Sequence, residues 1–531
     1  MKRLKVRAAG TRRRVAQLGG RRVKGSPLAD CSEEGPAGSV VVRAATMEIL
    51  LVATELSPFI SSTDTAEEIF ALARTFKQLG HEVTVIAPFD NAFERGGVAV
   101  ARRLTPLTVP DGRVITVFDA QLSSGAKLVL LGMPVGADGR LISADVPDEA
   151  AVQAAATFAR AIAAFVDQRA ELGQPVDVVH LFNWTAALVG LALRHSPKST
   201  TPSIVLSVHD ARKVAKIERN RVVGMDDALL LDATLEFGAQ LSLLKAGVVA
   251  ADAIVVPSES HADLWADTNS GGELAPVLAG RRSEIVAVPG GVDYARVNPV
   301  TNPSLAARYD AEDCSAKLVT KVAVQREVGL SLDERPLVLI PGPMTADAGG
   351  DIVVEALNAL LEQPLSLLIW STPSDPPSLI GELERRIAGR ATNVAHRIIK
   401  NEDEIHRGLA AADFVVYPFR NVAGQGRFLA AQRYGAVVVG LTSPGVRDAI
   451  VDCDAELLSG TGFLFDEPNG LALAGAVARA LAAFHQPNFT KLRRRVMRQD
   501  CSWERPARRM LQIYKRARTG KQRESTFETS V

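Results

Sequence analysis

Cysteine is scarce in this chain of 531 residues, and its four cysteines are widely spaced. Cys31, Cys314, Cys453 and Cys501 form no Cys-x-x-Cys pair, so neither a disulfide framework nor a cysteine-based zinc site is expected. This usage fits a reducing, cytoplasmic compartment. Aromatic residues make up only 5% of the chain, whereas hydrophobic residues make up 47%, which predicts a core of mostly Ala, Val, Leu and Ile.

A strong net charge and a long apolar run are also missing. The formal net charge is only +1, which argues against nucleic acid or a membrane surface as the general partner. No run of 18 uncharged apolar residues occurs, so no transmembrane helix is expected. We see no cluster with the spacing of metal ligands, and we expect no metal site.

Residues 1–46 differ from the rest of the chain. Met1–Lys24 carries ten Lys or Arg and no acidic residue, and it lacks the apolar run of a signal peptide. One interpretation is a transit peptide, which would direct the protein to a plastid. The interpretation that we favour is that Met47 is the true start, because a buried strand begins immediately after it. In both cases disorder is expected here.

Strands and helices alternate after Met47. Met47–Ala53 and His81–Ala87 read as buried strands, and the apolar residues of Ala66–Leu79 recur on one helical face. A βαβ unit implies a parallel sheet. The alternation continues and predicts a doubly wound domain over 47–295. Its further expected elements are a helix at 148–171, strands at 177–182, 203–208, 253–257 and 285–288, and a helix at 235–250.

The second half repeats the pattern beyond a hinge at Gly290–Gly291 and Asp293–Pro303. It predicts a second doubly wound domain over 296–518, whose last helix (503–518) is expected to cross back, followed by a tail at 519–531. The expected fold is therefore α/β, with two Rossmann-like domains facing a cleft. The expected elements are strands at 337–340, 365–370, 396–399, 414–417 and 436–441, and helices at 350–361, 378–388, 402–411, 426–434 and 470–484.

The stretch Asp413–Ile450 predicts a strand, a loop, a helix, a second strand and a second loop, in that order. Ligands in open α/β sheets bind beyond the carboxyl ends of strands and near helix N-termini. Part of any active site is therefore expected here. Yet Arg420 is the only charged residue in the first loop, Phe419–Gln425.

Eight ordered blocks resemble the bacterial glycogen synthase and plant starch synthase family. The closest is Leu235–Gly247 (LEFGAQLSLLKAG), which resembles LEFNGQISFLKAG, and DVVHLFNWTA at Asp177–Ala186 resembles DVVHAHDWHA. The other six are Thr54–Pro58, Val208–Asp210, Pro289–Asp293, Arg433–Gly435, Thr461–Phe463 and Asp500–Trp503. The resemblance implies the GT-B fold and a retaining glucosyltransferase that extends α-1,4-glucan from ADP-glucose, with no cofactor or metal.

The first domain departs from the family at its reacting groups. The lysine and glycines of the family's K-T-G-G align with Ser61–Asp64, and Asp64 would repel a diphosphate. Glu67 and Glu68 follow on the helix, where an anion site would need neutral groups. In the family's H-D-W-H block, the first histidine aligns with Phe182, and Asn183 and Thr185 replace the aspartate and the last histidine.

The second domain departs from the family in the same way. The arginine and lysine of the family's S-R-L-T-x-Q-K-G align with Pro343 and Ala348, which cannot pair with phosphate. The glutamate beside the reacting sugar aligns with Val422. The following Pro-Cys-Gly aligns with Ala423–Gln425, and the T-G-G loop aligns with Ser443–Gly445.

The catalytic residues are therefore unknown, since the family positions are held by Ser61, Phe182 and Val422. Six residues remain as substrate-binding candidates: Glu55, His209, Asp210, Arg420, Gly424 and Gln425. His180 is interpreted as a hydrogen-bonded core residue and Lys245 as structural. Arg420 is alternatively a residue that holds its own loop, and the basic run Lys491–Arg498 reads as a solvated helix face.

Two hypotheses remain. The first is a pseudoenzyme of α-glucan metabolism that binds α-glucan, a nucleotide sugar such as ADP-glucose, or a partner such as an active glycogen synthase. The second is an active retaining glycosyltransferase with an altered site. Removing one preorganised transition-state group typically costs roughly 100- to 1000-fold in rate, and several such groups are absent here. We therefore favour the pseudoenzyme.

Overall fold

The structure is a computed structural model that describes residues 46–60, 63–110, 112–133, 147–196, 201–222, 229–390, 392–421 and 424–528. The predicted basic segment 1–46 lies outside these residues except for Thr46. Ser61 and Val422 also lie outside them.

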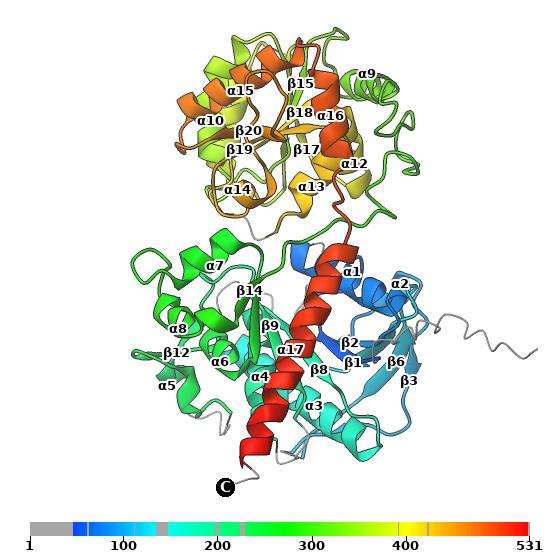
Figure 1. Cartoon of the computed structure of the whole chain (residues 1–531), viewed down its shortest axis with the longest axis vertical. Coiled ribbons are helices and arrows are strands. Elements are labelled where there is room, and N and C mark those ends of the chain that lie inside the picture. The colour runs from blue at the N-terminus through cyan, green and yellow to red at the C-terminus, as the bar shows by residue number, and fades with distance from the viewer. Residues whose placement is uncertain are drawn as a thin grey trace, which may run out of the picture. The chain divides into compact units, whose positions relative to one another are not determined.

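The first half of the described chain forms a nine-stranded sheet in the order β14-β13-β9-β8-β1-β2-β7-β6-β3 (Figure 1). The strands from β14 to β7 are parallel, and β6 and β3 are antiparallel to their neighbours. In chain order the bounds are β1 Glu48–Val52, β2 Glu82–Pro88, β3 Ala101–Arg102, β6 Val117–Gln121, β7 Lys127–Leu131, β8 Val178–Phe182, β9 Ser203–Ser207, β13 Ala253–Val256 and β14 Ile285–Ala287.

Helices cover both faces of this sheet because its central strands are apolar on both sides. Leu51 of β1 lies opposite Val85 of β2 and His180 of β8, and all of β8 and β9 is buried. The helices of this half are α1 Asp64–Gln78, α2 Ala92–Arg95, α3 Glu149–Glu171, α4 Ala187–Arg194, α5 Arg219–Val222, α6 Leu243–Ala250, α7 Glu259–Ala266 and α8 Ala275–Gly280. Two small sheets, β4 (Leu107–Thr108) with β5 (Val114–Ile115) and β10 (Lys216–Glu218) with β12 (Gln240–Ser242) and β11 (Glu236–Phe237), flank them.

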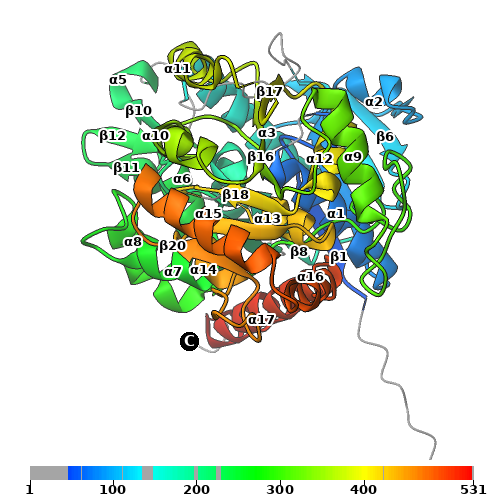
Figure 2. The same cartoon turned by 90° about the horizontal axis from the view of Figure 1, so that it is seen from above.

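The second half forms a six-stranded, wholly parallel sheet in the order β17-β16-β15-β18-β19-β20. Its strands are β15 Leu337–Ile340, β16 Ser366–Ser371, β17 Val394–Ile398, β18 Phe414–Tyr417, β19 Val437–Leu441 and β20 Gly462–Phe465. Its helices are α9 Lys317–Val328, α10 Gly350–Leu361, α11 Pro377–Ile387, α12 Glu402–Ala411, α13 Gly426–Arg433, α14 Val446–Ala449, α15 Gly470–Phe484 and α16 Phe489–Met497. Figure 2 shows α10 beside α15, and their buried residues belong to one core cluster. The predicted α/β class with two doubly wound sheets is confirmed.

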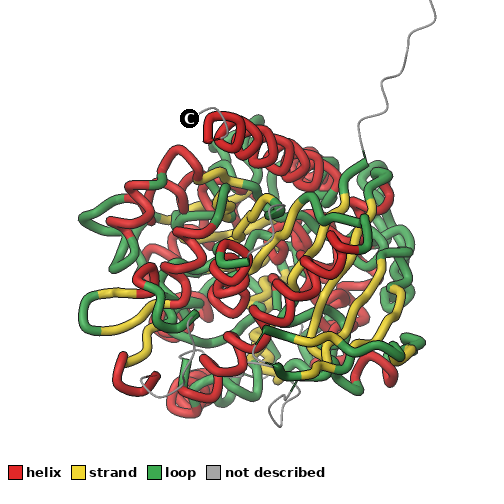
Figure 3. The backbone as a smooth tube through the Cα atoms, turned by 90° about the horizontal axis from the view of Figure 1, so that it is seen from below, coloured by secondary structure: helices red, strands yellow, loops and turns green. Residues whose placement is uncertain are grey.

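The last helix, α17 (Glu504–Glu528), returns to the first sheet (Figure 1). Tyr514 hydrogen-bonds through its hydroxyl to Nδ1 of His180 at 2.7 Å, and Arg518 pairs with Asp177 at 2.8 Å. The helix runs past its predicted end at 518. The tube in Figure 3 shows it as one continuous helical segment at the side of the strands.

One predicted helix is wrong in its first half. Residues 235–250 were expected to be helical throughout, but helix α6 begins only at Leu243, after the hairpin of β11 and β12. Gly238 adopts a left-handed φ of 63°, which turns the hairpin. The Ser242 hydroxyl then accepts from the backbone N–H of Lys245 and caps the helix.

Helix α3 is long and apolar enough to span a membrane by length and composition alone. However, 61% of its most apolar window is buried inside the protein, where residues such as Phe158 and Ile162 join the core of the first sheet. Its apolar character is therefore explained by packing.

Candidate functional site

A cavity of about 570 Å³ lies where the second sheet meets helix α1 and the segment that joins the two halves. The carboxyl ends of β15, β16, β17 and β18 open into it, as expected for an open parallel sheet. Its charged lining residues are Asp64, Glu67, Asp293, Arg296, Lys400, Glu402 and Arg427, with His406 beside them.

The α1 side of this cavity is acidic. Asp64 is the first residue of α1, directly after the capping Thr63, and Glu67 follows one turn later. Burial raises the pKa of Glu67 to about 7; the nearby Arg296 opposes this shift, and Asp64 and Glu402 add to it. An acid in such a place disfavours further negative charge in the cavity.

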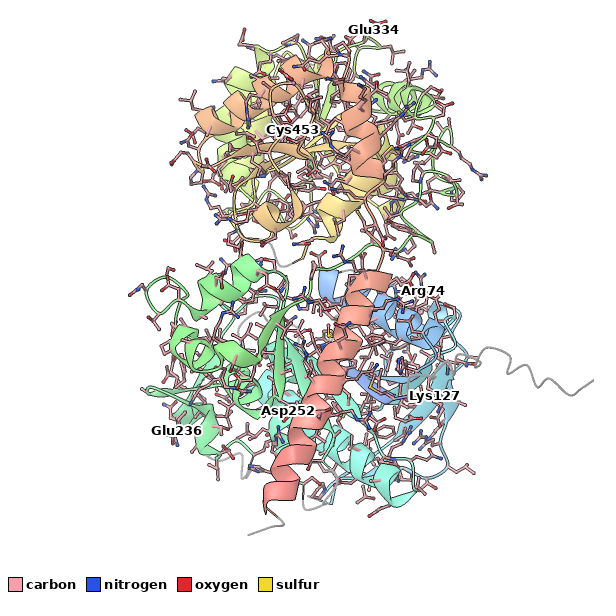
Figure 4. The ribbon with its side chains drawn as sticks, viewed as in Figure 1. Arg74, Lys127, Glu236, Asp252, Glu334 and Cys453 are labelled. Carbon is pink, nitrogen blue, oxygen red and sulfur yellow. The ribbon has the colours of Figure 1, made fainter. Side chains whose placement is uncertain are left out.

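Helix α1 and the joining segment each supply a cation that is already paired. Arg74, labelled in Figure 4, donates hydrogen bonds from both terminal nitrogens to the carboxylate of Asp293, at 2.8 and 2.5 Å. Arg296 pairs with Glu402 of α12 and lies 4.0 Å from the Glu67 carboxylate. These two guanidinium groups therefore neutralise protein carboxylates rather than face a ligand unopposed.

The second-half side of the cavity holds two cations that the sequence reasoning missed. Arg427, the second residue of α13, donates to the carbonyl of Gly342 at 3.2 Å, and Lys400 follows β17. Both side chains are exposed, and neither has an ion-pair partner among the residues that the structure describes. The sequence signal for Arg427 is its place two residues after the loop Phe419–Gln425, at the start of the next helix.

The loop after β15 corresponds to the predicted phosphate loop. Pro343 lines the cavity, and Ala348 is buried. Gly349 takes a left-handed φ of 73°, and a Cβ there would lie 2.2 Å from the carbonyl oxygen of Pro418, so only glycine fits.

Asp347 in this loop points toward the first half of the chain. Arg212 pairs with it at 3.1 Å and with Asp210 at 3.0 Å, so one guanidinium bridges two carboxylates across the two halves. The predicted candidate Asp210 is therefore occupied by Arg212, a residue that the sequence reasoning did not single out.

The loop after β18 is held by its own side chains. Arg420 pairs with Asp351 through two contacts of 2.7 Å and donates to the carbonyl of Ala346. Gln425 is buried and donates to the carbonyl of Gly445. Gly424 lies against Asp64, because a Cβ at Gly424 would meet the Asp64 carboxylate oxygen at 2.8 Å.

His209 lies in a buried polar cluster at the end of β9. Its Nε2 contacts the Glu68 carboxylate at 2.6 Å, and its Nδ1 lies 3.2 Å from the Asn183 side-chain oxygen. Burial alone would lower the pKa of His209, but the Glu68 carboxylate outweighs it and raises the pKa, with smaller contributions from Asp64 and Glu55. Glu68 thus already satisfies this imidazole.

His180 is a core residue, as interpreted from the sequence. It is fully buried, and its two ring nitrogens contact the hydroxyls of Tyr514 and Ser207 at 2.7 and 2.8 Å. Burial, with His209 nearby, lowers its pKa to about 3, so it stays neutral. The ring of Phe182, at the position of the family's histidine, lies against the His180 ring with the ring centroids 4.2 Å apart and the planes tilted by 30°.

The predicted residues thus divide into groups. Of those on described residues, Pro343 lines the cavity, and so do Asp64 and Glu67, the carboxylates that the sequence places against a diphosphate. His209 lies near Glu55 and the α1 carboxylates, whereas Arg420 and Asp210 join the ion pairs of the phosphate loop. Ser61 and Val422 lie outside the described residues. Within the described ranges, no group of three or more His, Cys, Asp or Glu is arranged to hold a metal ion.

The comparisons with known proteins agree with this architecture. Residues 48–280 match the family described as starch synthase catalytic domain, and residues 335–483 match glycosyl transferases group 1. The chain is 30% identical over 490 residues to a glycogen synthase of Thioalkalivibrio sulfidiphilus, covering 88% of this chain and 99% of the relative. It is 27% identical over 494 residues to glycogen synthase 2 of Geobacter sulfurreducens, covering 89% and 99%.

The fold is similar to that of a solved structure. The catalytic domain of starch synthase IV from Arabidopsis thaliana, bound to ADP and acarbose, superposes with a TM-score of 0.78 at 18% identity. The match covers 90% of this chain and all of that one.

Proposed function

The chain belongs to the glycogen synthase and starch synthase family of GT-B glycosyltransferases, and from this premise we propose that it is a catalytically impaired member that binds rather than transfers. In this proposal the protein acts in α-glucan metabolism in the cytoplasm. It binds α-glucan, a nucleotide sugar such as ADP-glucose, or an active synthase, and it requires no cofactor.

The observation that carries the proposal is the state of the loop after β15. Transfer from a nucleotide sugar builds negative charge on the leaving diphosphate, so cations must be placed there in advance. This loop instead presents Pro343, Ala348 and the carboxylate of Asp347, which engages Arg212. The one charged side chain of this loop is therefore an acid paired with Arg212, and the loop offers no cation to a phosphate.

The acidic α1 side of the cavity supports the same reading. Asp64 and Glu67 stand where the resemblance would place the glycines and the helix N-terminus of a phosphate site. Ser61, Phe182 and Val422 at the remaining family positions cannot supply a cation, an imidazole or a carboxylate. Losses of this kind are not additive, but each single one typically lowers the rate by roughly 100- to 1000-fold.

One observation favours the alternative of an active enzyme with an altered site. Arg427 and Lys400 face the cavity without a carboxylate partner among the described residues, so they could hold a diphosphate from a new direction. The protein would then be a retaining glycosyltransferase that moves glucose from ADP-glucose to an α-glucan.

Glucose incorporation separates the two. The purified protein is incubated with radiolabelled ADP-glucose or UDP-glucose and glycogen, and label in the polymer is counted. We expect no incorporation above the enzyme-free background. Turnover that disappears in Arg427→Gln would establish the active alternative, since this change removes the cation on which that alternative depends.

A further inference from the structure

The charged groups that line the 570 Å³ cavity nearly cancel. Four carboxylates line it (Asp64, Glu67, Asp293 and Glu402), against three side chains that are always cationic at neutral pH (Arg296, Lys400 and Arg427). Arg74, outside the lining, neutralises Asp293. With Arg74 counted, and with Glu67 about half protonated at neutral pH, the cavity carries close to zero net charge.

A nucleotide diphosphate does not fit such a lining. Its phosphates carry at least two negative charges, and sites that bind them in low dielectric supply matching cations. Here the cations Arg427 and Lys400 lie opposite the carboxylates of Asp64 and Glu67, which would repel the same phosphates. Glu67 belongs to α1 and Arg427 to α13, and both line this one cavity.

A neutral, hydroxyl-rich ligand fits better. Hydroxyl groups donate to carboxylates and accept from guanidinium and ammonium groups, so walls of mixed sign satisfy them without a charge mismatch. Apolar surface for the face of a sugar ring is offered by Phe70, which is partly exposed and lines the same cavity, whereas Tyr417 and Trp503 at its edge are buried. Its volume lies within the usual range for small-molecule sites.

We propose that this cavity binds a linear, neutral oligosaccharide, in the place where a nucleotide-sugar donor would have to sit. The proposal rests on the proposed function, and it narrows the ligands named there to the uncharged one. The carboxylates of Asp64 and Glu67 then accept from sugar hydroxyls on one wall, and Arg427 and Lys400 donate from the other.

Isothermal titration with maltotetraose, ADP and ADP-glucose tests the ligand class. We expect maltotetraose to bind at least about tenfold more tightly than either nucleotide. Equal or tighter binding of ADP or ADP-glucose would overturn the proposal.

The location is tested by filling the cavity. Ser374 is exposed and lines the cavity, so Ser374→Trp places an indole there without disturbing the core. We expect maltotetraose affinity to fall by at least about tenfold, whereas Ser315→Trp, at an exposed site outside the cavity, leaves it unchanged. Unchanged affinity in Ser374→Trp, with a wild-type unfolding midpoint, would place the sugar elsewhere and overturn the proposal.

The charge argument is tested by Asp64→Asn combined with Glu67→Gln, since amides keep the shape and still bond to hydroxyls. We expect the affinity for ADP to rise at least about tenfold and that for maltotetraose to change less than about threefold. Glu94→Gln, on the exposed part of α2, should change neither. If ADP affinity does not rise in the double variant, these carboxylates do not exclude phosphate and the inference fails.

These titrations are independent of the transfer assay. Glucose incorporation would contradict the impaired-enzyme proposal, whereas absent maltotetraose binding in an inactive protein would contradict only the assignment of the cavity.

Discussion

The charged groups around the buried Asp413 are paired with one another, whereas several of those that line the cavity are not, within the part of the chain that the structure describes. We call Asp413, Lys321, Arg493 and the strand start at Leu337 the buried frame. Asp413 is only 4% exposed and receives Lys321 and Arg493, each at 2.7 Å, together with the backbone N–H of Leu337 at 3.0 Å. Asp64 and Glu67, on the cavity wall, have no contact as close with any cation among the described residues. The charges of the buried frame therefore hold elements of the fold together, whereas Asp64 and Glu67 face the cavity without a close ion pair to any described residue.

The difference separates what the fold needs from what transfer needs. The blocks that resemble the family closely, such as Leu235–Gly247 and Arg433–Gly435, build packing contacts: a Cβ at Gly247 would lie 2.6 Å from Ala187, and Tyr434 bonds Asn302. Among the described positions that differ from the family, Pro343 and Ala348 lie in the loop after β15, and Phe182 is the last residue of β8, so these changes leave both sheets intact. This pattern fits a retained scaffold with altered chemistry.

The largest expected effect comes from breaking the buried frame. Asp413→Ala leaves Lys321 and Arg493 without their carboxylate in the core, and breaking a buried pair in this way typically costs about 3–5 kcal/mol. Chemical denaturation of the variant and the wild type measures this cost. Glu504→Ala, which removes an exposed pair with Arg508, should cost less than about 1 kcal/mol; equal costs for the two variants would refute the comparison.

Packing against β16 gives the next effect. A Cβ at Gly408 would lie 2.0 Å from the ring of Trp370, so Gly408→Ala should destabilise by about 1–3 kcal/mol although alanine favours helices. Gly475→Ala on α15, where a Cβ meets nothing within 4 Å, should instead stabilise by up to about 1 kcal/mol. The unfolding midpoint measured by thermal denaturation should fall for Gly408→Ala and rise for Gly475→Ala. A higher midpoint for Gly408→Ala would show that α12 does not pack this closely against Trp370.

Breaking the contact between α17 and the first sheet should lower the free energy of unfolding by a similar or slightly smaller amount. Tyr514→Phe removes the hydroxyl that bonds His180 and leaves a buried ring nitrogen without its partner, which should cost about 1–3 kcal/mol. Thr519→Ala removes an exposed hydroxyl contact from the same helix and should change stability by less than about 0.5 kcal/mol. The denaturation midpoints of the two variants measure these changes. An unchanged midpoint for Tyr514→Phe would mean that the bond to His180 does not anchor α17.

The smallest effect is a pH dependence on the cavity side, because the Glu67 side chain is 46% exposed and solvent screens its interactions. The pKa of Glu67 rises from 4.5 to about 7 in the folded protein, so the folded state retains a proton that the unfolded chain releases between these values. Stability that depends on Glu67 is therefore lost as pH rises through this window. Glu67→Gln should gain stability relative to the wild type between pH 5 and pH 8 in denaturation curves, and Glu94→Gln should not. A constant difference across this range would show that Glu67 titrates normally.

Much of the fold was predictable from the sequence, because buried parallel strands are short apolar runs with clear helices between them. Phe414–Tyr417 and Val437–Leu441 are such strands, and both appear as predicted. The hairpin before Leu243 was missed because apolar residues there also fit a helical face, and only the turn at Gly238 excludes it. Helix α9 was missed because its buried residues include Lys317, Thr320 and Lys321, which an apolar pattern cannot reveal.

The site was predictable in part. Its position beyond the strand ends follows from the alternation of elements, and Pro343 was expected there. Arg427 and Lys400 were not, because they follow different strands of one sheet and no motif links them. The Arg212–Asp347 pair was not, because it joins the two halves of the chain between residues 135 apart. No periodicity carries that information.

The central claim is that the frame remains while the diphosphate has no cations to hold it. Its most direct test is glucose incorporation into glycogen from radiolabelled ADP-glucose by Val422→Glu, measured with enzyme in excess over the donor. Val422 lies outside the described residues, and the change restores only the family's glutamate. The account predicts background incorporation, because Ser61, Pro343 and Ala348 still provide no cation. Strong incorporation by this single variant would contradict it.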